Sequence, residues 1–237
     1  MTRMLRAQGL GSAHPVITDV PVFVGAEEQR VADAAMWQEF REVEVVDRHG
    51  RLNAAALDSL AVLARPGVEY FAVFSDRGVQ CAVLVAALGE EAVVVVRAGD
   101  AVTVSSTSNR LLPELLVSYL PQVRPAGVQA ANIRLAEVDP AGDDPHVVLL
   151  DASPGVERDA ALVRMLRGQA ATGMGELYTA ARDRWGHRAV LADPILYRDS
   201  RAGRILVRYA GDYLSIAPAT SALLAQRLRE GQHDLAN

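Results

Sequence analysis

The sequence predicts an α+β fold of two quasi-symmetric halves, each an antiparallel β-meander flanked by helices, with a central sheet shared between the halves. An internal repeat supports this prediction: the segment Ala98–Ser105 returns 112 positions later (210 − 98) as Ala210–Ala217. The leucines that follow keep the same spacing, at Leu111, Leu112 and Leu116 and at Leu223, Leu224 and Leu228. Two copies of one unit can bury their apolar faces against each other, which favours a single two-lobed body.

A second set of matching segments lies upstream at a different spacing. Asp76-Arg77 corresponds to Asp183-Arg184, and Ala82–Leu84 to Ala189–Leu191, at 107 positions (183 − 76). The spacing therefore changes by five residues (112 − 107) between the two sets. We assign this change to one connection, which runs from Leu88 to Ala92 in the first copy and from Tyr197 to Gly203 in the second.

Runs of β-branched and apolar residues between turn signals predict four strands in each half. They lie at about 68–75, 79–87, 92–98 and 101–105, and at about 175–181, 187–196, 204–209 and 213–216. The connections are too short for parallel crossovers, so neighbouring strands are antiparallel. Helices are predicted at 26–41, after the capping residue Asn53, at 110–120, after Ser153-Pro154 and at 218–230. Strands grouped in this way, without βαβ alternation, indicate an α+β fold.

We expect one domain overall, with an N-terminal extension at 1–19, an N-terminal subdomain at 20–125 and a C-terminal subdomain at 126–237. Val20–Val24 reads as a short strand, and Pro21 places it at a sheet edge because proline cannot donate a ladder hydrogen bond. The stretch 121–144 is rich in Pro, Gly and Ala and is the best linker candidate.

Composition excludes several functional classes. The 237 residues carry a net charge of −5, which argues against nonspecific nucleic-acid binding. The single cysteine, Cys81, rules out an intramolecular disulfide and a multi-cysteine zinc site. The longest apolar run, Cys81–Leu88, is too short to span a bilayer, and Met1–Pro15 lacks the apolar core of a secretory signal. We therefore expect a cytoplasmic protein with neither nucleic acid nor membrane among its partners.

No set of residues predicts catalysis or cofactor binding. Thr172–Gly175 resembles a phosphate loop only superficially, because it precedes a strand and no Lys-Ser/Thr follows it. The five histidines are scattered along the chain, so a metal site is not expected. Nothing brings together a nucleophile, a base and an oxyanion donor. We expect no enzymatic activity, no cofactor and no metal.

The segment Tyr197–Val207 carries a strand end, an Asp-x-x-x-Gly-Arg turn and a β-branched strand. Together with Gly175–Tyr178, Arg182–Arg188 and the closing Ile216–Pro218, it resembles the EspG family of type VII (ESX) secretion-associated proteins. The similarity covers about Val20–Arg229. It implies two subdomains on a central antiparallel sheet, each with helices on one side. It also implies a cytosolic chaperone that binds the helical tip of the PPE subunit in a PE/PPE heterodimer, keeps it soluble and targets it for secretion.

The resemblance further implies a partner surface formed by one inter-strand loop and part of the C-terminal subdomain. The corresponding partner-binding candidates in this chain are Ser75, Asp76, Arg77, Gly78, Tyr197, Arg198, Asp199 and Arg204. The chain departs from the family in two places, because the loop is only Ser75–Gly78 and the opening helix is not recognisable in Met1–Asp19. An alternative role for Asp199 and Arg204 is to pair with each other and fix their turn.

Two other functional classes compete with the chaperone hypothesis. The first is a small-molecule-binding or enzymatic α+β protein with a pocket between the two halves. The second is a structural homodimer that self-associates through an edge strand such as Val20–Val24. A neighbouring PE/PPE-like gene pair would favour the chaperone, whereas a metabolite bound to the purified protein would favour the first alternative.

Overall fold

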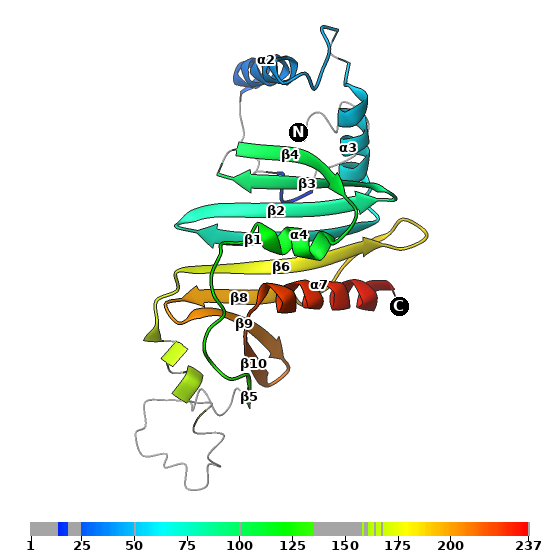
Figure 1. Ribbon diagram of the computed structural model, residues 1–237. Coiled ribbons are helices and arrows are strands. Elements are labelled where there is room, and N and C mark those ends of the chain that lie inside the picture. The colour runs from blue at the N-terminus through cyan, green and yellow to red at the C-terminus, as the bar shows by residue number, and fades with distance from the viewer. Residues whose placement is uncertain are drawn as a thin grey trace.

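The computed structural model describes residues 14–18, 25–49, 51–99, 101–134 and 168–236, together with 158, 161–163 and 165–166. Its centre is one antiparallel sheet in the order β4-β3-β2-β1-β6-β8-β9-β10-β5, with the short β7 also paired to β6 (Figure 1). The first half contains β1 (Val68–Asp76), β2 (Val79–Leu88), β3 (Glu91–Ala98) and β4 (Ala101–Ser108). The second contains β6 (Gly173–Arg182), β7 (Arg188–Val190), β8 (Ile195–Ser200), β9 (Gly203–Ala210) and β10 (Tyr213–Pro218), and β5 (Ala131–Arg134) closes its edge. The α+β class with a shared antiparallel sheet is confirmed.

The two halves meet where β1 pairs with β6, from Val68 opposite Ala181 to Asp76 opposite Gly173. Each half runs outward from this junction as a meander and then ends in a helix, α4 (Leu112–Ser118) or α7 (Ser221–Ala236). The pair β9–β10 begins 112 positions after β3–β4, which is the spacing of the sequence repeat (203 − 91). The halves thus have the same order of elements, and their common origin by duplication stays a prediction.

The five-residue difference between the halves lies elsewhere than the sequence predicted. The connections after Leu88 and after Ser200 are both two residues long, Gly89-Glu90 and Arg201-Ala202. The β6–β7 tip, 183–187, is instead three residues longer than the Arg77-Gly78 turn of β1–β2 (5 − 2), and the remaining extra residues lie between β7 and β8. The predicted strand 187–196 is also broken into β7 and β8, and residues 191–194 bulge opposite Tyr178 and Thr179. Pro194 accounts for the break because it cannot donate a ladder hydrogen bond.

Helices cover both faces of the sheet, rather than one side as the family resemblance implied. Helices α4 and α7 pack on the face that lies toward the viewer in Figure 1, over Tyr70, Leu177 and Leu206. On the opposite face, α3 (Ala54–Ala64) covers β2 and β3, with α2 (Ala26–Glu42) beside it. Val163 and Leu166 cover β5, β9 and β10 on that same face. Strand alternation explains this, because β2 is apolar on both faces and needs a cover on each.

The predicted capping residue of α3 matches the structure closely. The side chain of Asn53 caps α3 by accepting a hydrogen bond from the Ala56 amide at 2.7 Å.

Within the predicted extension 1–19, Val16 and Ile17 are buried against the sheet. The predicted strand Val20–Val24 and the stretch 135–157 lie outside the described residues. No helix in the described part of the chain combines the length and apolar character that a membrane crossing needs.

Candidate partner-binding surface

No described helix covers the sheet face opposite α4 and α7 at the junction of the two halves. Strand register places Val73, Glu176, Leu196 and Val207 in one row across β1, β6, β8 and β9. Ser75, Met174 and Arg198 form the next row on the same face. These rows and Tyr209 line a groove of about 840 Å³, which we call the central groove.

The central groove exposes an unusual amount of apolar surface for the middle of a sheet. Val73 is 39% exposed, and Met174 and Tyr209 are each 56% exposed. It lies between the cluster under α3 and the cluster under Val163 and Leu166. A concave apolar surface of this kind is typical of a site that receives another molecule.

The tip of the β1–β2 hairpin borders this groove. Arg77 and Gly78 both have positive φ angles, 50° and 83°, as expected for the tight two-residue turn that fits the twist of a hairpin. The Arg77 side chain is almost fully exposed and lies only loosely beside Asp76, at 4.0 Å. Ser75 and Gly78 themselves line the groove. The predicted tip therefore belongs to this surface geometrically.

Arg198 lies in the groove but already has partners inside the protein. Its guanidinium donates to the carbonyl oxygens of Leu166, at 2.6 Å, and of Gln169. These carbonyls lie at the C-terminal end of the helical residues 165–166 and 168, where helix carbonyls run short of intrahelical donors, and the Leu166 carbonyl also accepts from the Gln169 amide at 3.4 Å. Arg198 thus fastens the end of this segment to the sheet and forms one wall of the groove.

Tyr197, Asp199 and Arg204 lie on the other face of the sheet and are buried. The Arg204 guanidinium binds both carboxylate oxygens of Asp199, with distances of 2.7 and 2.8 Å. It also donates to the Pro121 carbonyl at 2.9 Å and stacks 4.2 Å from the centre of the Tyr197 ring. This is the arrangement expected if the two charged residues serve to fix their turn.

The eight predicted positions are thus divided between two faces. Ser75, Gly78 and Arg198 line the central groove, with Asp76 and Arg77 beside them at the hairpin end. Tyr197, Asp199 and Arg204 are each less than 5% exposed, and only Tyr197 of the three reaches the lining of the groove, so they offer a partner little surface. Sequence reasoning missed Val73, Met174, Leu196 and Tyr209. The available signal was strand alternation, which puts these residues on the face of Ser75 and Arg198.

A second buried polar cluster joins the two halves away from the groove. The carboxylate of Glu69, on β1, accepts hydrogen bonds from the guanidinium of Arg188, the first residue of β7, at 2.5 and 3.3 Å. It also contacts the His14 ring at 3.2 Å. Burial alone would raise the pKa of Glu69, but the hydrogen bonds from His14 and Arg188 outweigh it and hold the pKa below its ordinary value. The His14 ring also packs edge-on against Phe71. The cluster is internal and connects residues 14–18 to both halves.

The described residues show no arrangement suited to metal binding. No three His, Cys, Asp or Glu side chains among them converge as metal ligands. Cys81 is partly buried on β2, and burial raises the pKa of its thiol, which disfavours the reactive thiolate.

Comparison with known proteins gives a consistent result. A sequence model of the EspG family matches residues 2–230. A search of curated proteins found no match. Among solved structures, the Mycobacterium tuberculosis type VII secretion system chaperone EspG5, in complex with the PE25–PPE41 dimer, is similar with a TM-score of 0.70. The two chains are 21% identical, and the similarity covers 99% of this chain and 94% of the EspG5 chain.

Proposed function

Because this chain belongs to the EspG family, we propose that it is a type VII secretion chaperone that binds a PE/PPE-type heterodimer through the helical tip of the PPE subunit. The observation that carries the proposal is the family match over residues 2–230, to which the likeness to a chaperone–client complex adds support. The bound client would stay soluble and reach its own secretion machine. The protein would act in the cytoplasm and without catalysis.

The central groove is our candidate for the client surface. A helix tip exposes apolar side chains and backbone carbonyls that no further turn of helix can satisfy. Val73, Met174 and Tyr209 offer apolar contact area, and the exposed guanidinium of Arg77 at the rim, only loosely paired with Asp76, can donate to carbonyls. Burying exposed apolar area at about 25 cal/mol per Å² provides the main driving force. The β1–β2 tip would then contact the flank of the client.

The groove lies at the junction of the halves, where the alternative hypothesis placed a small-molecule pocket. Its polar groups do not converge on one point: Arg198 is used by the carbonyls of Leu166 and Gln169, and Glu176 accepts from the Tyr178 hydroxyl. Small-molecule sites combine an apolar lining with a few convergent polar groups. The open apolar surface favours a protein partner.

The test is co-expression with each PE/PPE pair encoded in the same genome, followed by size-exclusion chromatography and titration calorimetry of the purified complex. Met174→Glu places a charge in the centre of the groove and should weaken binding about tenfold or more, as expected at an interface hot spot. Val31→Glu is the matched control, because Val31 is a similarly exposed apolar residue on α2.

The two variants also separate loss of binding from loss of fold. Both should keep the circular dichroism spectrum of the parent protein, since each changed side chain faces solvent. If no encoded PE/PPE pair forms a complex with the parent chain, the proposed function is wrong. If a complex forms but Met174→Glu binds as tightly as the parent, the function holds and the groove is the wrong surface.

A further inference from the structure

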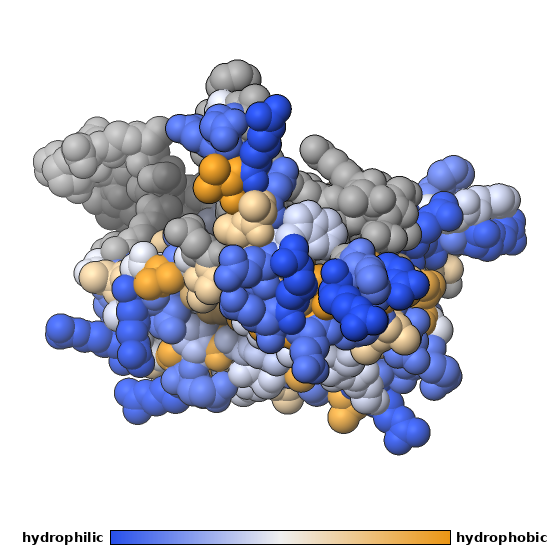
Figure 2. Space-filling model, turned by 90° about the horizontal axis from the view of Figure 1, so that it is seen from above, coloured by the Kyte–Doolittle hydropathy of each residue, from blue (hydrophilic) through white to orange (hydrophobic). Residues whose placement is uncertain are grey.

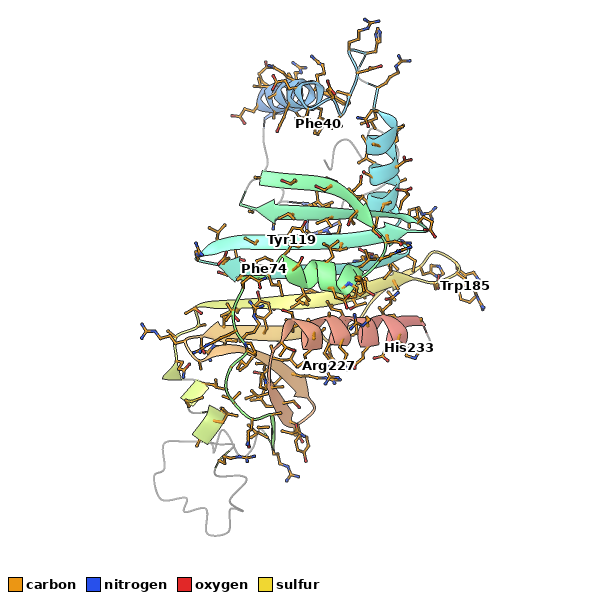
Figure 3. All side chains as sticks on the ribbon, in the orientation of Figure 1. Phe40, Phe74, Tyr119, Trp185, Arg227 and His233 are labelled. Atoms are coloured by element: carbon orange, nitrogen blue, oxygen red, sulfur yellow. The ribbon has the colours of Figure 1, made fainter. Side chains whose placement is uncertain are left out.

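The end of the β6–β7 hairpin carries the most exposed large aromatic side chain among the described residues. Trp185 is 68% exposed and belongs to none of the three apolar clusters. The guanidinium of Arg184 stacks over its ring, 4.0 Å from the ring centre. Figure 3 shows Trp185 on the loop that extends past the neighbouring strands. The ring therefore keeps most of its surface for a contact outside this chain.

The turn at this hairpin end is built without the side chains of Arg184 and Trp185. The carboxylate of Asp183 accepts hydrogen bonds from the backbone amides of Trp185 and His187, each at 2.9 Å. Gly186 supplies the positive φ angle, 86°, that the turn requires. Folding of the turn thus explains Asp183 and Gly186, and it leaves the exposed tryptophan and its stacked arginine without a structural role.

The hairpin end is basic, although the chain as a whole is acidic. Residues 182–188 contain three arginines and one aspartate, a net charge of +2 (3 − 1), whereas the whole chain carries −5. Arg65, at the end of α3, adds another cation, because a Cβ atom at Gly186 would lie 3.8 Å from its guanidinium. Figure 2 shows this end of the molecule from above as a projection on which strongly hydrophilic residues surround paler ones.

Two of these arginines already have partners inside the protein. Arg182 donates to the Gly186 carbonyl at 2.9 Å, and Arg188 binds the carboxylate of Glu69. Arg65 and Arg184 are exposed, and neither forms an ion pair within the described part of the chain. We call Arg65, Arg184 and Trp185 together the basic tip.

We propose that the basic tip is a docking site for an acidic segment of a second protein partner. Carboxylates of that segment pair with the guanidiniums of Arg65 and Arg184, and an apolar side chain beside them packs on the ring of Trp185. Tryptophan and arginine are among the residues most enriched at interface hot spots. The hydrogen-bonded turn holds the tip in place before binding, which lowers the entropy cost of association.

An acidic protein segment fits the basic tip better than an anionic membrane or a nucleic acid does. Membranes and nucleic acids are extended negative surfaces, and the net charge of −5 opposes the approach of this chain to them. The tip itself offers two available guanidiniums and one aromatic ring. Such a small site matches a few carboxylates next to an apolar residue.

The basic tip and the central groove lie at opposite ends of the β1–β6 junction. Val68 pairs with Ala181, beside the tip, whereas Asp76 pairs with Gly173, beside the groove. These two ends of β1 are eight residue steps apart (76 − 68), or about 26 Å along the strand. A partner at the tip leaves the groove open, so the inference does not depend on the proposed client.

The fluorescence of Trp185 in the full chain tests the proposal. The chain has two tryptophans, and Trp37→Phe leaves Trp185 as the only one. The probe is a synthetic peptide that repeats Asp-Leu-Glu, and its neutral twin repeats Asn-Leu-Gln. The acidic peptide should change the Trp185 emission saturably, with an affinity about tenfold or more above that of the neutral twin, and should bind more weakly as salt is added.

A charge reversal at the tip should weaken this binding. Arg184→Glu in the Trp37→Phe background should raise the dissociation constant of the acidic peptide about tenfold or more. The matched control is Arg201→Glu, which makes the same change in the exposed β8–β9 turn at the other end of β6 and should bind like the parent. Trp185→Ala, followed by titration calorimetry, should also weaken binding about tenfold. Circular dichroism confirms that each variant is folded.

Three results would overturn the proposal. The first is the absence of saturable binding of the acidic peptide to the parent. The second is equal weakening by Arg184→Glu and Arg201→Glu, which would reveal a general effect of charge. Phosphatidylglycerol vesicles and a single-stranded oligonucleotide are titrated in parallel for the third. If either changes the Trp185 emission while the acidic peptide does not, the tip serves a membrane or a nucleic acid instead.

Discussion

At the scale of single residues, two ion pairs each place a buried carboxylate beside an arginine. Asp199–Arg204 fixes the β8–β9 turn, and Glu69 with Arg188 ties the two halves together. Both carboxylates are nearly inaccessible to solvent. A buried pair contributes little net stability, but removal of one partner leaves an uncompensated charge and is costly.

Asp199→Ala should therefore lower the free energy of unfolding by about 3–5 kcal/mol, because it leaves the Arg204 guanidinium buried and unpaired. Urea denaturation measures the change. Glu230→Ala is the control: Glu230 pairs with Arg227 on the exposed face of α7, and its loss should cost about 0–1 kcal/mol. Equal effects of the two substitutions would contradict the structural role given to Asp199.

Glu69 predicts a specific loss of stability in acid. Its pKa in the folded protein lies below the ordinary value of 4.5, so its contribution is complete above about that pH and is lost as the pH falls through the lower folded value. Glu69→Gln should cost about 1–3 kcal/mol near neutral pH and should flatten the decline in stability below pH 4.5. Denaturation series from neutral to acid pH measure both effects. The exposed Glu27→Gln should leave the pH curve unchanged.

At the scale of secondary-structure elements, long-range hydrogen bonds add to apolar packing in holding the segments that flank the second half of the sheet. Arg198 joins the helical residues 165–166 to β8 through the Leu166 carbonyl. The β8–β9 turn is likewise joined to residues 124–126, since Arg204 donates to Arg124 at 2.8 Å and accepts from Ala126 at 2.9 Å through backbone groups.

Arg198→Ala should loosen the helical segment without unfolding the sheet. Hydrogen exchange at residues 161–168 should become faster, because the carbonyls of Leu166 and Gln169 lose their donor. Exchange in β1 and β6 should not change. The control is Arg201→Ala, in the exposed neighbouring turn. If this variant also exchanges faster at residues 161–168, the effect is not specific to Arg198.

Gly203 illustrates how backbone packing selects a residue. Its φ angle is 117°, and a Cβ atom there would lie 2.6 Å from the Arg124 carbonyl oxygen and 2.8 Å from backbone atoms of Ala126. Gly203→Ala should therefore cost at least about 2 kcal/mol of unfolding free energy by thermal or urea denaturation. Gly78→Ala also has a positive φ angle but meets no atom within 4 Å, so it should cost less. The opposite ranking would contradict this explanation.

At the scale of the whole molecule, the continuous sheet makes the two subdomains interdependent. The β1–β6 junction pairs nine consecutive residues from each half, and Tyr70, Leu177 and Leu228 share one apolar cluster. A fragment comprising residues 20–125 would expose the whole β1 edge and one side of that cluster. The division into subdomains at residue 125 remains a prediction about organisation, and independent folding is not expected from it.

Fragments 20–125 and 126–237, expressed separately, should each be aggregation-prone, because each leaves a long apolar strand edge unpaired. Co-expression of the two should restore a soluble complex through the β1–β6 junction. The measurement is the soluble yield and the elution volume in each case. A soluble, folded 20–125 fragment on its own would show that the halves are independent domains.

The sequence alone was enough to determine the α+β class, most strands, the antiparallel pairing and the family, because these depend on local periodicity, short connections and motifs. It did not determine which face of the sheet each residue occupies relative to the helices. Tyr197 and Arg198 are neighbours in one motif, yet one is buried under α4 and α7 and the other lies in the central groove. The break at Pro194, the shared Glu69–Arg188 pair and the groove itself also required the tertiary structure. The physical reason is that burial depends on which segments pack on each face, and residues far apart in the chain decide that packing.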